Sequence, residues 1–204
     1  MLRRSGIRLA LSAGVVALAA SLAGLSTWAS FTDSTTSTHA VSTGTVELDL
    51  GAAGTADNRL DVDVGNVAPG DTAERAVTLL NTSSLPLDHI DMSTVATTSS
   101  LLDTDTTHGL QVVLERCSIP WTETPLGGGG FTYACAGTTT TVLASRPVVM
   151  TAQALSSLAL GAGGGTAYLR VTTSLPPSAG NAFQSSSSEL DLTFSATQRN
   201  ATNR

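Results

Sequence analysis

Three histidines are the first candidates for metal chemistry in this chain of 204 residues: His39, His89 and His108. A zinc protease needs about three protein ligands around the ion and a carboxylate that acts as a base. The His-Glu-x-x-His spacing, which places two ligands on one helix face, is absent. The histidines lie apart, in a polar segment and in strand-like or turn-like surroundings. The sequence therefore predicts no metal site and no catalytic residue.

Two groups of acidic residues could bind calcium: Asp57, Asn58, Asp61 and Asp63 in the first group, and Asp103 and Asp105 in the second. Neither has the glycine and the terminal glutamate of an EF-hand loop. Asp61 and Asp63 alternate with apolar residues, so positions on the solvent face of a strand explain them better. No cofactor is predicted.

Other motifs that carry chemistry are incomplete. The chain is rich in serine but has no Gly-x-Ser-x-Gly elbow. The glycines of residues 161–166 resemble a phosphate loop in composition, yet the Lys-Ser/Thr pair is missing, and a hairpin tip is the better interpretation. These patterns favour a binding or structural protein over an enzyme.

Cys117 and Cys135 are the only cysteines in the chain. An even count in an exported protein indicates a disulfide, and a pair of buried free thiols is the alternative. Trp121 lies in the loop between the two cysteines and is expected to pack over their bridge.

The first 29 residues have the pattern of a signal peptide. Arg3, Arg4 and Arg8 precede an uncharged apolar run, and a cleavage site between Ala29 and Ser30 follows. The alternative is an uncleaved anchor, but the run is shorter than the roughly 20 residues that a bilayer requires. We expect cleavage by a signal peptidase, no stable membrane span afterwards, and a secreted or cell-surface location.

The chain that remains after cleavage is acidic. It keeps seven arginines and sixteen carboxylates, a net charge of −9, and contains no lysine. Because it has no basic stripe, nucleic acid is not an expected partner.

Alternation of apolar and polar residues recurs along residues 44–204 and is typical of strands with one buried face. It predicts about nine short strands: residues 46–50, 60–64, 76–80, 87–95, 110–117, 138–143, 148–155, 167–173 and 190–196. Residues 51–58, 118–130, 161–165 and 176–188 are rich in Gly, Ser or Pro and predict surface loops. We expect an all-β domain, a two-sheet antiparallel sandwich that is jelly-roll-like.

The chain resembles the TasA/camelysin family of exported bacterial proteins at both ends and in the middle. The family has a Thr-Trp/Tyr-Ala cleavage site, an aromatic-x-Asp start and a Gly-Thr-Leu-Asp-Leu-like strand, which match residues 27–33 and 44–50. Its Pro-Gly-Asp turn and Asn-Thr strand end match residues 69–71 and 81–82. Its Asn-x-Tyr-Gln-Gly loop and closing Phe-x-Ala-x-Gln strand match residues 181–185 and 194–198. The chain departs from the loop pattern at Ser185, where the family has glycine, and in carrying the Cys117–Cys135 loop.

The resemblance implies a jelly-roll subunit of extracellular matrix fibres, exported through a dedicated signal peptidase. Fibre members polymerise when the N-terminal segment of one subunit completes the sheet of the next. The camelysin name also implies a secreted metalloprotease, although the sequence shows no ligand set for it. A monomeric surface adhesin or binding module is a further alternative.

Residues 30–43 would form the exchanged segment, which we call the arm. The arm carries Phe31, Asp33, Ala40 and Val41 among Ser and Thr residues, too few apolar side chains to anchor it within its own subunit. Pairing of the arm with an open sheet edge of another copy would satisfy backbone groups on both sides. Because that contact is head-to-tail, it would propagate as a filament, and self-association is the expected partnership.

Overall fold

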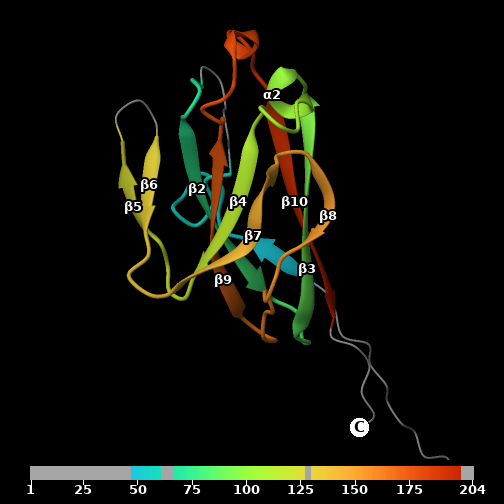
Figure 1. Cartoon of the computed structure of the whole chain (residues 1–204). Coiled ribbons are helices and arrows are strands. Elements are labelled where there is room, and N and C mark those ends of the chain that lie inside the picture. Colours follow the sequence, from blue (N-terminus) through green and yellow to red (C-terminus); the bar gives the residue numbers. More distant parts are fainter. Residues whose placement is uncertain (1–46, 61–66, 127–129, 199–204) are drawn as a thin grey trace, which may run out of the picture. The chain divides into compact units, whose positions relative to one another are not determined.

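The computed structural model describes residues 47–60, 67–126 and 130–198. Within these ranges the chain forms ten strands and two short helical turns (Figure 1). The elements are β1 (Leu48–Leu50), β2 (Thr72–Asn81), β3 (Leu87–Thr98), α2 (Leu101–Thr104), β4 (Gln111–Cys117), β5 (Thr122–Pro125), β6 (Phe131–Ala134), β7 (Thr139–Pro147), β8 (Met150–Ala154), β9 (Gly165–Ser174), the 3-10 turn η2 (Asn181–Phe183) and β10 (Glu189–Gln198).

The strands form two main sheets and one ribbon. The larger sheet has the order β1-β2-β9-β4-β7, the smaller sheet has the order β10-β3-β8, and β5 pairs with β6. Every strand pairing within the described residues is antiparallel. β9 lies between β2 and β4, so strands far apart in sequence are neighbours, as the predicted sandwich requires. The all-β, antiparallel prediction is confirmed.

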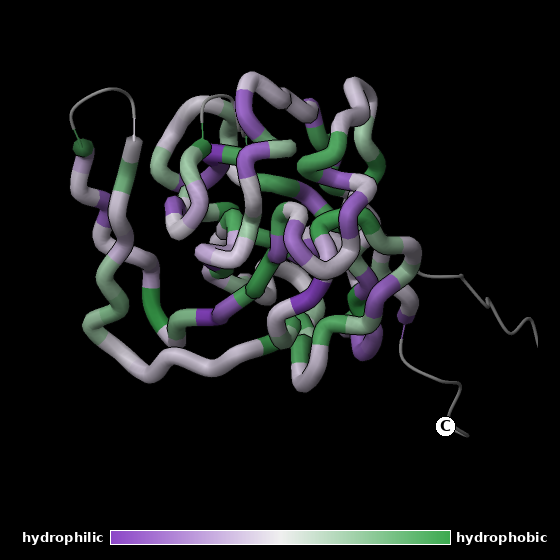
Figure 2. Tube along the Cα trace, turned by 45° about the horizontal axis from the view of Figure 1, so that its top comes forward, coloured by the Kyte–Doolittle hydropathy of each residue, from purple (hydrophilic) through white to green (hydrophobic). Residues whose placement is uncertain are grey.

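The expectation of a loop over residues 118–130 is wrong in part, because β5 lies inside it. Thr122–Pro125 pairs with Phe131–Ala134 to form a two-stranded ribbon. Figures 1 and 2 both show this ribbon beside the larger sheet, and Figure 2 colours it mostly in pale shades of intermediate hydropathy. The sequence Thr-Glu-Thr-Pro has no apolar alternation, so its strand character comes from its partner and could not be detected locally.

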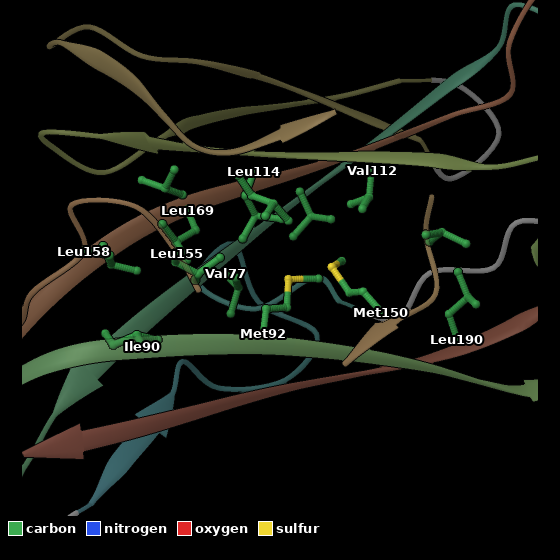
Figure 3. Packing of buried hydrophobic residues seen from close by; sticks show 14 of the residues in the cluster. Val77, Ile90, Met92, Val112, Leu114, Met150, Leu155, Leu158, Leu169 and Leu190 are labelled. Atoms are coloured by element: carbon green, nitrogen blue, oxygen red, sulfur yellow. The ribbon is translucent and has the colours of Figure 1, made fainter. Parts of the chain in front are cut away.

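The core fills the space between the two sheets, and alternation decides which side chains enter it. Leu169 on β9 and Leu114 on β4 point inward from the larger sheet, and Ile90 and Met92 on β3 face them from the smaller one (Figure 3). All four are almost fully buried. Removal of such apolar surface from water is the main favourable term in folding, so these residues hold the sandwich together.

The strand registers define two ends of the sandwich, to which we refer below. At the arm end, β2 ends at Asn81 opposite Gly165, and β10 ends at Gln198 opposite Leu87. At the distal end, β2 begins at Thr72 opposite Ser174, and β10 begins at Glu189 opposite Thr98. At the arm end, Asn81 on β2 connects the two sheets, because its side-chain amide donates to the carbonyls of Leu85, just before β3, and of Leu160, which pairs with Leu87.

Candidate assembly surface

Strand β10 forms one edge of the smaller sheet, with β3 on its inner side. Its inward side chains are apolar: Leu190 is buried, whereas Leu192, Phe194 and Ala196 are only partly buried against the core. Within the described residues, no strand pairs with the outer side of β10 between Leu190 and Thr197. An edge of this kind, from Leu190 to Thr197, is a template for another strand.

The other edges are short or irregular. β1 has only three residues, and β8 has five. β8 also carries Ala152 at a φ of 43° and a register shift opposite β3. β7 pairs with β4 through two register shifts and ends at Pro147, which has no N–H to donate. Bulges, short strands and prolines discourage edge pairing. β10 shifts register against β3 only at its two ends, so residues 190–197 are the longest regular stretch of edge in the described part of the chain.

The residue that precedes β1 is held at the arm end by Ser83. The Ser83 hydroxyl accepts a hydrogen bond from the Glu47 N–H at 3.3 Å, and its single proton is shared between the Glu47 carbonyl, also at 3.3 Å, and Asn81 Oδ1. Ser83 is fully buried. β1 then runs from Leu48, opposite Asn81, toward the distal end. Glu47, the residue before β1, therefore lies at the arm end of the sandwich.

Asn81 supports this anchor from inside the protein. Its side-chain amide is fully buried and donates to the carbonyls of Leu85, Leu160 and Gly161 at 2.7–3.2 Å. Its Oδ1 accepts from the Ser83 N–H at 3.0 Å and from the Ser83 hydroxyl. A buried side chain with its polar atoms satisfied in this way rigidifies the segments that it joins.

A groove of about 300 Å³ lies at the distal end, between residues 67–69 and the loop of residues 180–185. These are two of the stretches that carry the family resemblance, and more than 100 positions separate them in sequence. Pro69 and Gly70 form a tight turn in which the Asp71 N–H donates to the Ala68 carbonyl at 2.9 Å. Gly70 has a φ of 96°, which only glycine adopts without strain. The Gly70 N–H donates to the Leu175 carbonyl, and this bond fixes the turn against the end of β9.

A disulfide joins Cys117 to Cys135, with a Cα–Cα distance of 5.7 Å, and closes the segment that contains the ribbon. Trp121, which lies in this segment, donates its indole N–H to the Tyr168 carbonyl at 3.1 Å. The Arg170 guanidinium lies 4.7 Å from the centre of the Trp121 ring, a cation–π contact. The segment is thus docked on β9.

Charged side chains complete this docking on the outer face of the larger sheet. Arg170 forms ion pairs with Glu74 on β2, at 3.1 Å, and with Glu115 on β4. The Tyr133 N–H donates to Glu74 at 3.1 Å, and the Tyr133 carbonyl accepts from Arg170 at 3.2 Å. The ribbon therefore contacts a layer of ion pairs rather than an apolar surface.

Glu123 connects the ribbon to the segment before β2. Arg59 contacts both of its carboxylate oxygens, at 3.0 and 3.2 Å, and the Tyr133 hydroxyl donates to it at 2.8 Å. The hydrogen bonds from Arg59 hold the pKa of Glu123 below its ordinary value. Burial, together with the Glu123 contact, raises the pKa of Tyr133 to about 12. Across the physiological pH range Glu123 is therefore ionised and Tyr133 is neutral.

Asp103 lies in a buried polar cluster at the distal end. Its carboxylate accepts hydrogen bonds from the Ser188 hydroxyl at 2.6 Å, the Ser100 N–H at 2.6 Å and the Ser99 hydroxyl at 2.7 Å. Burial by itself would raise the pKa of Asp103, but these donors outweigh it and the pKa lies below the ordinary value. The contacts to Ser99 and Ser100 cap α2, and the contact to Ser188 ties α2 to the start of β10. Asp103 is thus a structural anchor.

Residues 6–112, slightly more than half of the chain, match the family described as Camelysin metallo-endopeptidase. The chain belongs to the camelysin family. No curated protein matches it significantly.

The camelysin family description implies a metal ion, but the described residues do not fit one. Nowhere in residues 47–60, 67–126 and 130–198 do three or more His, Cys, Asp or Glu side chains converge as ligands. His89 contacts Asp91 at 3.3 Å on β3, and His108 contacts Asp105 at 3.5 Å in the turn after α2. Each histidine thus has one carboxylate neighbour, too few for a zinc site.

The acidic groups considered for calcium are separated or used locally. Asp57 accepts a hydrogen bond from the Thr78 hydroxyl, and the Asn58 side chain donates to the Gly51 carbonyl. Asp105 accepts from the N–H groups of His108 and Thr107, which lower its pKa. Asp103 is committed to the three donors described above. These side chains already serve turns and caps.

The remaining predicted positions lie outside the described residues: Ala29, Ser30, Phe31, Asp33, His39, Ala40, Val41, Asp61 and Asp63. In the part of the chain that the structure describes, no helix is long and apolar enough to cross a membrane.

Sequence reasoning missed the groove, the Asn81–Ser83 anchor and the ion-pair layer under the ribbon. The groove and the anchor could have been suspected from the motif residues that carry the family resemblance. No local signal pairs Arg170 with Glu74 or Glu115, because these residues meet only through strand register.

Proposed function

We propose that this member of the camelysin family is an exported structural subunit that forms extracellular fibres by donor-strand exchange. The arm of one copy pairs with β10 of the next. The edge of β10 over residues 190–197 carries this proposal, because no described strand pairs with its outer side and Leu192, Phe194 and Ala196 are only partly buried, so they can pack against an added strand. The resemblance to exported fibre proteins and the family match support it.

The arm has the matching chemistry. Phe31, Ala40 and Val41 supply apolar side chains, and the Thr and Ser residues between them suit an extended backbone. Main-chain hydrogen bonds would provide affinity, while alternate side chains would fill the gaps along β10.

Deletion of residues 30–41 from the secreted form tests the proposal. The truncated protein retains the sandwich and β10, so we expect a folded monomer that no longer forms fibres in electron micrographs. A synthetic peptide of residues 30–43 should bind this monomer, and a scrambled peptide of the same composition should not. Fibres of unchanged appearance from the truncated protein would contradict the proposal.

The family description favours a second candidate function, a secreted metallo-endopeptidase. Zinc content and casein cleavage by the purified protein decide it. Casein turnover that is lost in His89→Ala or His108→Ala, and that zinc restores in the unmutated protein, would establish this function. An adhesin would remain monomeric in electron micrographs even with the arm intact.

A further inference from the structure

We propose that the groove of residues 67–69 and 180–185 is a docking site for a second copy of this chain. It receives residues 42–46 of the next copy, while the arm of that copy runs antiparallel along β10. This inference rests on the proposed function. It adds the direction in which the arm runs along β10 and a second contact between copies, in the groove.

Strand direction is the first argument. Glu47, the residue before β1, lies at the arm end, and β10 runs from the distal end to the arm end. In a filament of copies stacked in one orientation, the arm end of one copy meets the distal end of the next. An arm that enters there, with its N-terminus leading, runs antiparallel to β10. An arm folded back onto its own β10 would run parallel, which is slightly less stable per residue and unlike every described pairing.

Charge favours the same direction. If the arm lay parallel to β10 with Phe31 beside Glu189, Asp33 would stand opposite Asp191, and like charges opposite one another destabilise a sheet. In the antiparallel direction the acidic start of β10 faces the other end of the arm, close to His39. Asp33 then lies near the uncharged end of β10 at Thr197.

Length places the next residues in the groove. β10 has ten residues, and residues 31–41 cover a similar distance at about 3.4 Å per residue. Residues 42–46 therefore extend past Glu189 at the distal end. The loop of residues 180–185 leads into β10 there, and the turn of residues 67–69 lies beside it.

The chemistry of the groove suits that segment. None of its lining residues is charged, and Ser42, Thr43, Gly44, Thr45 and Val46 are also uncharged, so the two meet without repulsion in an acidic protein. Asn181 and Gln184 are exposed at the groove and offer side-chain amides to an extended backbone, while Phe183 is buried beneath them. The segment consists of small residues apart from Val46, which allows a close approach.

Cross-linking measures the polarity. Val41→Cys is combined with Asp191→Cys, near the start of β10, or with Thr197→Cys, near its end; Asp191 and Thr197 are both exposed. Fibres are treated with a short bismaleimide, which leaves the native disulfide intact. We expect intermolecular cross-links with Asp191→Cys and about tenfold fewer with Thr197→Cys, because a strand of this length separates the two positions by roughly 20 Å. The reverse ratio overturns the inference.

Gly180→Trp tests the groove. A Cβ at Gly180 would meet no atom within 4 Å, Gly180 is exposed, and the φ of −89° suits any residue, so the monomer should keep its fold and melting temperature. Thr124→Trp, on the exposed ribbon, is the matched control. We expect fibre elongation to slow about tenfold or more in Gly180→Trp and to be unchanged in the control, since a filled groove excludes the incoming segment.

The outcomes separate the two proposals. Normal elongation of Gly180→Trp overturns the groove while leaving donor-strand exchange standing. An unmutated protein that stays monomeric with an intact arm overturns both.

Discussion

Ser185 occupies the left-handed region with a φ of 58°. The family pattern has glycine at this point of the loop, and the backbone explains why, because only glycine adopts this conformation without a steric cost. We predict that Ser185→Gly stabilises the protein by up to about 1 kcal/mol, since the relief of strain exceeds the added entropy of the unfolded chain. Urea denaturation of the monomer measures this.

Ser187→Gly is the matched control for that change. Ser187 is exposed in the same loop and does not have a positive φ. The Ser187→Gly variant should lose about 0.5 kcal/mol of unfolding free energy, because glycine at this position only increases the conformational entropy of the unfolded chain. Equal effects of the two substitutions would show that the conformation of Ser185 costs nothing.

The stability of the protein in acid depends on Asp103, whose carboxylate holds Ser188 at the start of β10. Its pKa is lower in the folded protein than in the unfolded chain, so its contribution is complete above about pH 4 and is lost as pH falls further. Asp103→Asn should cost about 1–3 kcal/mol at neutral pH, because Ser99, Ser100 and Ser188 lose their charged acceptor.

Melting temperatures between pH 2 and pH 7 test this prediction. The unmutated protein should lose stability below pH 4 more steeply than Asp103→Asn. Asp88→Asn, an exposed change of the same charge on β3, should leave the acid profile unchanged. Parallel profiles for Asp103→Asn and the unmutated protein would remove Asp103 as the acid-sensitive anchor.

The ribbon of β5 and β6 is the element that depends most on cross-links. A two-stranded ribbon is marginal by itself, and this one rests on a disulfide and on ion pairs rather than on the core. We predict that the Cys117→Ser/Cys135→Ser double variant loses about 3 kcal/mol of unfolding free energy, since the disulfide closes a loop of 18 residues.

Amide hydrogen exchange locates the effect. In the double variant, the amides of residues 122–124 and 131–134 should exchange faster by a larger factor than those of β2, β9 and β4, whose exchange rises only with the overall loss of stability. Protection of the ribbon that survives loss of the disulfide would assign its docking to Arg59, Arg170 and their carboxylate partners.

At the scale of the whole molecule, net charge governs association. Each copy without residues 1–29 carries −9, so approaching copies repel one another at low ionic strength. Between about 10 and 150 mM salt the screening length falls from roughly 30 to 8 Å, and we predict faster fibre formation over this range. Light scattering measures the rate. A rate that falls with salt would show that attraction between charges drives assembly.

Alternation in sequence was sufficient for the fold class. Leu169, Ile90 and their like recur at every second position, and a half-buried strand is the conformation that places such residues on one face. The cysteine count predicted the pairing of Cys117 with Cys135, because a chain with two cysteines has one possible disulfide within the chain.

Tertiary structure alone decided which of the described strands lie at a sheet edge and what the polar residues contact. Strand order leaves β10 at an edge and puts β9 between β2 and β4, and that order follows from packing over the whole core rather than from any local pattern. It brings Arg170 between Glu74 and Glu115, and Asn81 against the Leu160 carbonyl. Such contacts join positions about 50 to 100 residues apart, and periodicity within one strand says nothing about its neighbours.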